Sequence, residues 1–157
     1  PAVCNAQSPN QTCRGIQIAA ANSIMVQMDI SEDTTIGDNA NEIIQYTYDA
    51  ANERVTRSTS CNAAQPFLGD TAASGNPRTV LVRNPAAIPV FRYFDGAGAE
   101  IPPGIPPASM PPARIPDIRR IDITLVVDTE FVDPNTNQRR RMIYSTSVIP
   151  RNHAPVF

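Results

Sequence analysis

One alternating stretch constrains the fold of this chain more than any other feature. Within Ile118–Thr129, aliphatic side chains stand at every second position from Ile121 to Val127, and mostly polar residues lie between them. Strand side chains alternate between two faces, so this pattern buries one row and leaves the other row in solvent. An all-parallel sheet would need apolar residues on both faces. The stretch therefore predicts the central strand of an antiparallel sheet.

The proline content points to the same fold class. The chain has 157 residues, which is enough for one domain with a core. Its 16 prolines are about twice the usual share, and proline fits poorly inside helices and central strands. We therefore expect a mainly β protein, an antiparallel sheet with long loops, in a single unit over residues 1–157.

Other alternating segments predict the remaining strands, about seven in all. They are expected at Ser23–Ile30, Glu42–Asp49, Glu53–Ser60, Thr79–Arg83, Val90–Asp95 and Arg141–Ile149. Segments rich in polar residues, Gly or Pro are expected to be irregular. These are residues 1–15, Ser31–Asn41, Cys61–Pro77, and Glu100–Pro116 with its Pro-rich loop Pro102–Pro116. The one place for a helix is Gly15–Ser23, because of its Ala19–Ala21 run.

The apolar faces of these strands supply the predicted core. Along the return strand Arg141–Ile149, for example, Met142, Tyr144, Thr146 and Val148 share one face. The residues expected to carry the fold are Ile44, Tyr46, Phe91, Tyr93, Ile121, Ile123, Leu125 and Val148.

The net charge of the chain limits the kinds of binding partner that we expect. A net charge of -2 argues against general attraction to nucleic acid or to anionic membranes. Arg139–Arg141, with Arg119, Arg120 and Arg151, could form a basic patch that contacts phosphate. Charged residues in such a place also guard an edge strand against pairing with another chain. We favour the guarding role, so nucleic acid is not an expected partner.

The sequence contains no candidate for membrane insertion. No stretch approaches the roughly 20 apolar residues that span a bilayer, and no signal segment stands at the start. The chain begins at Pro1 without Met, which indicates a processed product or a trimmed chain. Membrane contact is therefore expected only through a segment outside the given sequence.

Three cysteines suggest an oxidising compartment. Cys4 and Cys13 flank a polar, turn-prone loop that a disulfide could close. Their spacing fits neither a CxxC redox pair nor a zinc knuckle. We favour a Cys4–Cys13 bridge, with pairing of either residue to Cys61 as the alternative, and the sequence does not choose among the three connectivities.

The sequence offers few residues that could catalyse a reaction. The only histidine is His153, four residues from the end of the chain, whereas nucleophilic catalysis needs a base positioned in a buried site. The sequence also shows no pair of acidic residues suited to face each other across a cleft. It contains no glycine-rich phosphate-binding loop. We expect no enzyme activity, no catalytic residues and no cofactor.

One acidic loop is a weak candidate for a metal site. Asp29, Glu32, Asp33 and Asp38 lie close together in sequence, and hard oxygen ligands on a loop can hold Ca²⁺. Their spacing departs from that of an EF-hand, so a solvated acidic loop is the favoured interpretation. We therefore expect no bound metal, and calcium stays the minor alternative.

Four motifs in order resemble a known family. Glu42-Ile-Ile-Gln-Tyr-Thr-Tyr-Asp49, followed by Arg54-Val-Thr-Arg57, resembles the E-x-I-x-Y-x-Y-D … L-x-R hairpin of minor pilins. The segment from Val82-Arg-Asn-Pro85 through Phe91-Arg-Tyr-Phe-Asp95 to Gly98 resembles their N-V … F-x-Y-F-D-x-x-G segment. Ile118 to Leu125 resembles their I-R-x-V-x-I-x-L strand, and Ser147 to Asn152 their V-x-x-R-N ending. The set is similar to W-type minor pilins of type IV pili and to the J-type pseudopilin of type II secretion.

The resemblance implies a structural role. It implies an α+β pilin-like whole in which a long apolar N-terminal helix, not contained in this sequence, joins a β-rich headpiece. A split pilin with the helix on a separate polypeptide would look the same. The expected function is to initiate, cap or pack in a cell-surface filament, extracellular or periplasmic, with other pilin or pseudopilin subunits as partners. A closed barrel or a two-sheet sandwich would count against this interpretation.

A different class of function is the alternative. The chain could be a free-standing secreted β-domain that binds carbohydrate or protein. A short cleavable signal directly upstream, without an apolar helix, would support that hypothesis.

Overall fold

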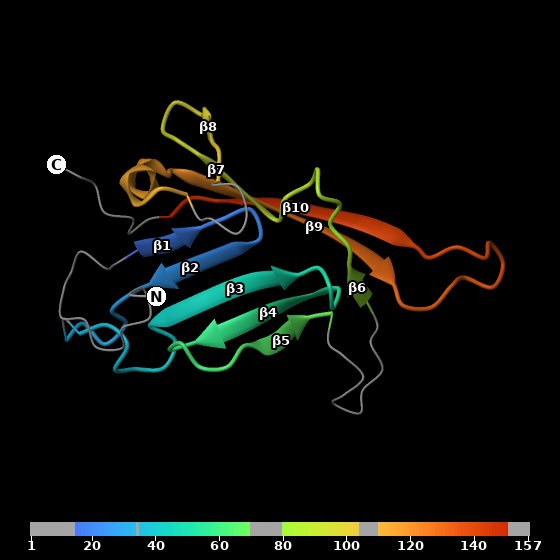
Figure 1. The fold of residues 1–157 in the computed structure, drawn as a ribbon, viewed down its shortest axis with the longest axis horizontal. Helices are drawn as coiled ribbons and strands as arrows, with labels where there is room; N and C mark the ends of the chain where they lie inside the picture. Colours follow the sequence, from blue (N-terminus) through green and yellow to red (C-terminus); the bar gives the residue numbers. More distant parts are fainter. Residues whose placement is uncertain (1–14, 34, 70–79, 104–109, 151–157) are drawn as a thin grey trace.

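The chain folds into two antiparallel β-sheets (Figure 1). The computed structural model describes residues 15–33, 35–69, 80–103 and 110–150. In the first sheet the strands lie in sequence order. They are β1 (Gly15–Ala19), β2 (Ser23–Gln27), β3 (Ile43–Asp49), β4 (Arg54–Thr59) and β5 (Gln65–Leu68). The prediction of a mainly β, antiparallel fold is confirmed, with two sheets where the sequence analysis expected one.

The second sheet is built around one long strand. Its order is β10-β9-β7-β8, and β6 also pairs with β9. The strands are β6 (Val80–Val82), β7 (Phe91–Phe94), β8 (Glu100–Ile101), β9 (Arg120–Thr129) and β10 (Arg141–Val148). β9 pairs with β10 along one side, and with β7 and then β6 along the other. The alternating stretch of the sequence is therefore the central strand, as predicted.

The two sheets share one hydrophobic core. Ile16, Ala19 and Ile24 from the first sheet pack in the same buried cluster as Phe91 and Tyr93 from the second. Backbone bonds also connect the sheets: the Phe91 N–H donates to the Ala21 carbonyl (2.9 Å). The Tyr93 hydroxyl donates to the Ala20 carbonyl (2.9 Å), and burial raises the pKa of this phenol. Tyr93 thus fastens one sheet to the other.

The predicted core residues divide into three groups. Phe91, Tyr93 and Ile121 are buried, and Tyr46, Ile123 and Leu125 are partly buried against the core. Ile44 is partly buried. Val148 is 44% exposed and does not belong to the core. The reason is its position on β10, an edge strand exposed along its whole length, where Val148 lines an open space between the two sheets.

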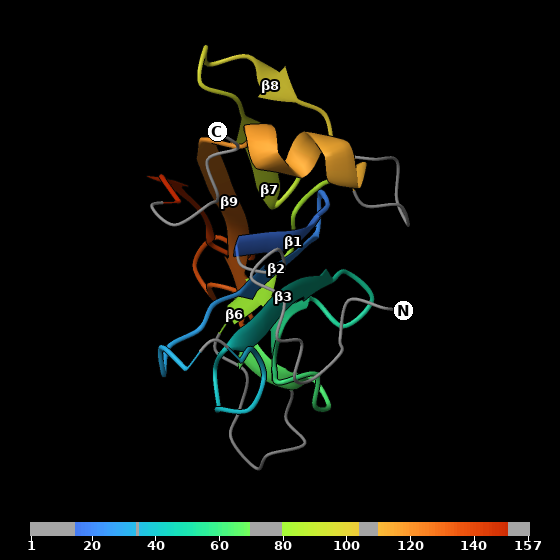
Figure 2. The same cartoon turned by 90° about the vertical axis from the view of Figure 1, so that its left-hand side faces the viewer.

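Three segments expected to be irregular or helical contain other structure. Gly15–Ser23 begins with β1 instead of a helix, because pairing with β2 supplies bonds that so short an isolated helix could not sustain. Cys61–Pro77 contains β5. Glu100–Pro116 contains β8 and most of a 3-10 helix, Pro112–Asp117, which lies against β1 (Figure 2).

The outer face of β2 is covered, which the alternation did not predict. Met25 and Gln27 lie on the face of β2 opposite Ile24 and Val26, and both are buried. The acidic loop Ser31–Asn41 folds back over them, and Met25 packs with Ile36 and Ile43 in a second apolar cluster. β2 accordingly ends at Gln27 and does not extend to Ile30.

A buried carboxylate organises this loop. Glu42 is fully buried. Its carboxylate accepts bonds from the N–H groups of Gly37 (2.8 Å), Asn39 (3.2 Å) and Ile30 (3.2 Å) and from the Ser31 hydroxyl (3.0 Å). Burial alone would raise the pKa of the Glu42 carboxyl, but these bonds lower it to about 2. Glu42 is therefore ionised at neutral pH and holds both ends of the loop.

One side chain fills a gap in the second sheet. β7 pairs with β9 only at residues 120–123, and β6 only at 127–129. Between them, the Asn84 amide donates to the Thr124 carbonyl (2.8 Å) and accepts from the Val126 N–H (2.9 Å). The Asn84 amide also donates to the Ile88 carbonyl (3.1 Å). Asn84 thus replaces the missing backbone partners of β9, as buried peptide groups require.

The cysteines lie only partly within the described residues. Cys4 and Cys13 lie outside them. Cys61 follows β4 at an exposed turn and is disulfide-bonded. Because the sequence has only three cysteines, a bond at Cys61 favours its pairing with Cys4 or Cys13, which was the alternative, over the Cys4–Cys13 bridge that the sequence analysis favoured.

Candidate functional site

An apolar groove between the two sheets is the strongest candidate site in the described structure. Its volume is about 640 Å³, within the range of ligand pockets. Residues of β1, β2 and β3 line one side, and residues of β7, β9 and β10 line the other. The side chains and backbone along it are those of Gly15, Ile16, Ile24, Val26, Gln27, Met28, Asp29, Tyr46, Phe91, Ile121, Ile123, Val148 and Pro150.

Cross-strand pairs build both walls of the groove. In the first sheet Ile16 stands opposite Val26, and Ile24 opposite Tyr46. In the second sheet Phe91 stands opposite Ile123, and Ile121 opposite Val148. Directly opposed residues point to the same face of a sheet, so four such pairs create two facing apolar surfaces. The groove follows from strand register and not from a loop.

The groove offers little polar chemistry. Its lining contains no basic side chain, and its polar members are Gln27 and Asp29. The Asp29 carboxylate accepts a bond from the Asp33 N–H (3.2 Å) and therefore serves the turn that follows β2. Such a lining suits an apolar segment, whereas sugars and phosphates require several converging polar groups.

Sequence reasoning identified many of these residues but not their role. Tyr46, Phe91, Ile121, Ile123 and Val148 were all predicted to be core, and all five line the groove. An alternating aliphatic row signals a surface that must be covered, without saying what covers it. The cross-strand pairs between β1 and β2 were missed because β1 was not among the predicted strands.

The acidic loop does not assemble a cation site. Asp29, Glu32, Asp33 and Asp38 are exposed or half-buried, and Asp33 accepts a bond from the Thr35 N–H (2.8 Å). Within the part of the chain that the structure describes, no group of three or more acidic, His or Cys side chains is placed to hold a metal ion. The carboxylates of Asp29, Asp33 and Asp38 accept hydrogen bonds from neighbouring residues of the loop. His153 lies outside the described residues.

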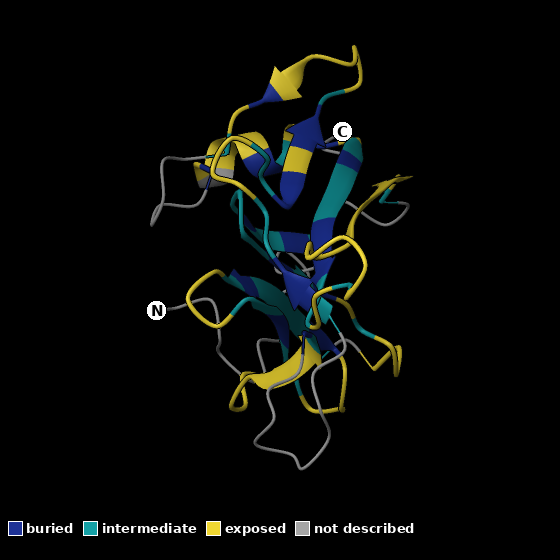
Figure 3. Ribbon diagram, turned by 90° about the vertical axis from the view of Figure 1, so that its right-hand side faces the viewer, coloured by how far each residue is buried: buried dark blue, intermediate teal, exposed yellow. Residues whose placement is uncertain are grey.

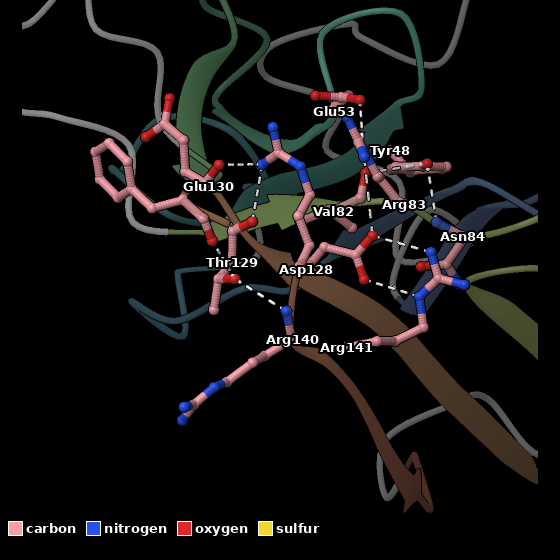
Figure 4. A network of polar contacts seen from close by, with 12 residues as sticks. Tyr48, Glu53, Val82, Arg83, Asn84, Asp128, Thr129, Glu130, Arg140 and Arg141 are labelled. Atoms are coloured by element: carbon pink, nitrogen blue, oxygen red, sulfur yellow. Dashed lines mark hydrogen bonds and ion pairs between the residues drawn. The ribbon is translucent and has the colours of Figure 1, made fainter. Parts of the chain in front are cut away.

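The described arginines of the predicted basic patch bond to other residues of the fold, and Figure 4 shows Arg140 and Arg141 among them. Arg139 donates to the carbonyls of Thr129 and Glu130, Arg140 pairs with Asp133 (2.7 Å), and Arg141 binds Asp128. Arg119 donates to the Pro116 carbonyl, and Arg120 pairs with Asp122 (3.0 Å). Arg151 lies outside the described residues. Of the described members of the predicted basic patch, Arg120, Arg140 and Arg141 are therefore paired with carboxylates, whereas Arg119 and Arg139 bond to backbone carbonyls.

Asp128 is the centre of the polar network in Figure 4. Its side chain is buried and receives two bonds from Arg141 (2.8 and 2.9 Å), while Arg83 lies 3.9 Å away and pairs with Glu53 (2.6 Å). The hydrogen bonds from Arg141 lower the pKa of the Asp128 carboxyl. The network ties β10 to β9 and to the β3–β4 turn.

Replacing Arg141 with alanine tests this network. The change leaves the buried Asp128 carboxylate without its two hydrogen bonds from Arg141. We therefore expect the free energy of unfolding to fall by about 1–2 kcal/mol at pH 7. Because the pKa of Asp128 is depressed in the folded state, the stabilisation exists above its ordinary value of 3.8 and disappears as the pH falls below it. Urea unfolding should show a deficit at pH 7 that shrinks progressively as the pH is lowered below 3.8. Arg140→Ala, which removes an exposed pair, is the control and should cost less than about 0.5 kcal/mol.

No protein-family model, curated protein or solved structure matches this chain. Among the described residues, no helix is long and apolar enough to cross a membrane.

Proposed function

We propose that this chain is the β-rich headpiece of a filament subunit of the type IV pilus or type II secretion pseudopilus class, and that it acts by assembly. The observation that carries the proposal is the apolar groove between the sheets. A long apolar helix is the component that the sequence resemblance implies, and apolar grooves receive helices through side chains at positions i, i+3, i+4 and i+7. The groove is the surface on which such a helix would rest.

The arrangement of the sheets bears on this proposal in two ways. A shared core between two sheets resembles a sandwich, which counts against a pilin-like headpiece. In a closed sandwich, however, the two inner faces interdigitate and fill the space between them. Here about 640 Å³ stays open along facing apolar walls, and both sheets keep free edges. The open groove favours a molecule that is completed by another apolar element.

The alternative, a secreted domain that binds carbohydrate, has weaker support. Carbohydrate sites combine aromatic platforms with many hydrogen-bonding groups, whereas this lining is mainly aliphatic. Binding of an apolar protein segment would use the same groove as the proposed helix. The two protein-binding roles therefore differ in the origin of the segment and not in the chemistry of the site.

The gene directly upstream of the Pro1 codon distinguishes these origins. A Gly-Phe-x-x-x-Glu motif followed by about 20 apolar residues is the expected result for a filament subunit. A short cleavable signal, together with a neighbouring gene for a helix-only protein, would identify a split pilin. A cleavable signal without such a neighbour would contradict the filament proposal.

A peptide titration tests the groove itself. The chain has no tryptophan, so a designed 20-residue helix with a Leu and Ile face and a single Trp reports binding through its own fluorescence. We expect a blue shift that saturates with the wild-type chain. Val148→Arg, which places a charge on the exposed rim of the groove, should weaken binding at least tenfold.

The matched control lies on the same strand. Ile143 is 62% exposed and points to the opposite face of β10, so Ile143→Arg should bind the peptide like the wild type. Equal binding by Val148→Arg and the wild type, or the absence of any blue shift, would show that the groove does not receive a helix.

A further inference from the structure

β10 is a sheet edge without the usual protection. Natural edge strands are guarded by short length, proline, a bulge, charge or a covering segment. Four of the five edge strands in the described sheets follow this rule: β8 has two residues, β6 has three, β5 has four including Pro66, and β1 has a bulge and lies against the 3-10 helix. β10 has eight residues in regular register and is exposed along its whole length (Figure 3).

The exposed edge is apolar and uncharged. Residues 142–150 contain no acidic or basic side chain. Five large apolar side chains stand in solvent on or next to the strand: Met142 45%, Ile143 62%, Tyr144 55%, Val148 44% and Ile149 71% exposed. The only charge on β10 is Arg141, which is held by Asp128 at 2.8 Å. Nothing on this edge repels a second uncharged strand.

The hydrogen-bond register shows which backbone groups are available. The Thr129 N–H donates to the Arg140 carbonyl (3.0 Å), and the pairing of β9 with β10 continues without a shift to Val148. In an antiparallel pair, residues alternate between facing the partner strand and facing away from it. The backbone groups of Ile143, Ser145 and Ser147 therefore point outward to the free edge.

We propose that β10 pairs antiparallel with β10 of a second copy of this chain, about a twofold axis at Ser145. This register sets outward-facing residues against outward-facing residues, with Ile143 opposite Ser147 of the other copy. It also places Met142 opposite Val148, and apolar cross-strand pairs stabilise sheets. The two sheets become one continuous sheet across the dimer.

A second copy suits this edge because the two Arg141 charges would lie far apart and because both edges carry exposed apolar side chains. The two Arg141 side chains would stand at opposite ends of the paired strands, about 26 Å apart, well beyond the screening distance of roughly 10 Å at moderate ionic strength. The partner strand would cover exposed apolar side chains on or next to β10 in each copy. Among the described residues, β10 is also the longest strand with an unpaired side.

Sedimentation velocity of the chain and of charge variants at Ser145 tests the proposal. The wild type, 17.0 kDa as a monomer, is expected to sediment as a dimer at micromolar concentration. Ser145→Lys places two positive charges together at the axis and should yield monomer, as should Ser145→Glu. An equimolar mixture of these two variants should restore the dimer, because Lys meets Glu across the axis. Thr136→Lys, in the exposed turn before β10, is the control and should stay dimeric.

A backbone variant separates strand pairing from side-chain effects. Ser145→Pro removes an outward N–H without removing a backbone bond to β9, although the exposed hydroxyl contact with Thr124 (3.3 Å) is lost, so the dimer should be lost while the far-ultraviolet circular dichroism is kept. A wild type that stays monomeric up to about 1 mM would overturn the proposal. A dimer that survives Ser145→Lys with unchanged affinity, or a mixture of the charge variants that does not dimerise, would also overturn it.

Discussion

Replacing Asn84 with alanine is expected to lower the free energy of unfolding by roughly 3 kcal/mol. The variant loses three hydrogen bonds, to Ile88, Thr124 and Val126. Val126 is buried, so its N–H cannot turn to bulk water and is left without a partner. The stretch of β9 between β7 and β6 should loosen. Urea unfolding measures the stability loss, and hydrogen exchange at the Val126 amide measures the local opening.

The variant Asn84→Asp shows whether β9 depends on the size of the Asn84 side chain or on the hydrogen bonds that its amide donates. Aspartate has the same size and still accepts from the Val126 N–H, but its carboxylate faces the carbonyls of Ile88 and Thr124 without donors. We expect a loss of stability similar to that of Asn84→Ala. Asn135→Ala, in an exposed turn, should change stability by less than about 0.5 kcal/mol. A loss below about 1 kcal/mol for both Asn84 variants would show that β9 does not depend on this amide.

Replacing Glu42 with glutamine is expected to cost roughly 3 kcal/mol at neutral pH. Glutamine keeps the size of the side chain but turns an –NH₂ group toward backbone N–H donors. The loop Ser31–Asn41 should then release Ile36 and expose Met25. Hydrogen exchange at the Gly37 and Asn39 amides, which donate to Glu42, should accelerate. The same change at Glu32, an exposed residue of the loop, should have little effect.

The pH dependence provides a second readout for Glu42. Its carboxyl has a pKa of about 2 in the folded chain against an ordinary value of 4.5. A depressed folded pKa stabilises the protein above the ordinary value, and that contribution is lost as the pH falls from about 4.5 toward 2. Thermal unfolding should therefore show that the gap between wild type and Glu42→Gln narrows across this range. A gap that stays constant down to pH 2 would contradict the role of the ionised carboxylate.

Local patterns in the sequence were sufficient for the main strands. The alternation in Ile118–Thr129 predicted β9 as the central strand, because strict alternation of apolar and polar side chains fits a half-buried strand and few other structures. The β3–β4 hairpin followed from two such runs around a short turn. The acidic loop before β3 was also predicted as irregular. In each case the signal lies in neighbouring residues and needs no distant contact.

The tertiary structure decided which faces are covered. Met25 is buried because a loop residue, Ile36, packs on it, and Val148 is exposed because β10 extends to a sheet edge. β1 forms a strand because β2 offers a partner. The roles of Glu42 and Asn84 depend on bonds to residues that only folding brings near. Periodicity thus identified the surfaces that avoid water, while the position of each strand in its sheet determined whether a core, a groove or a free edge results.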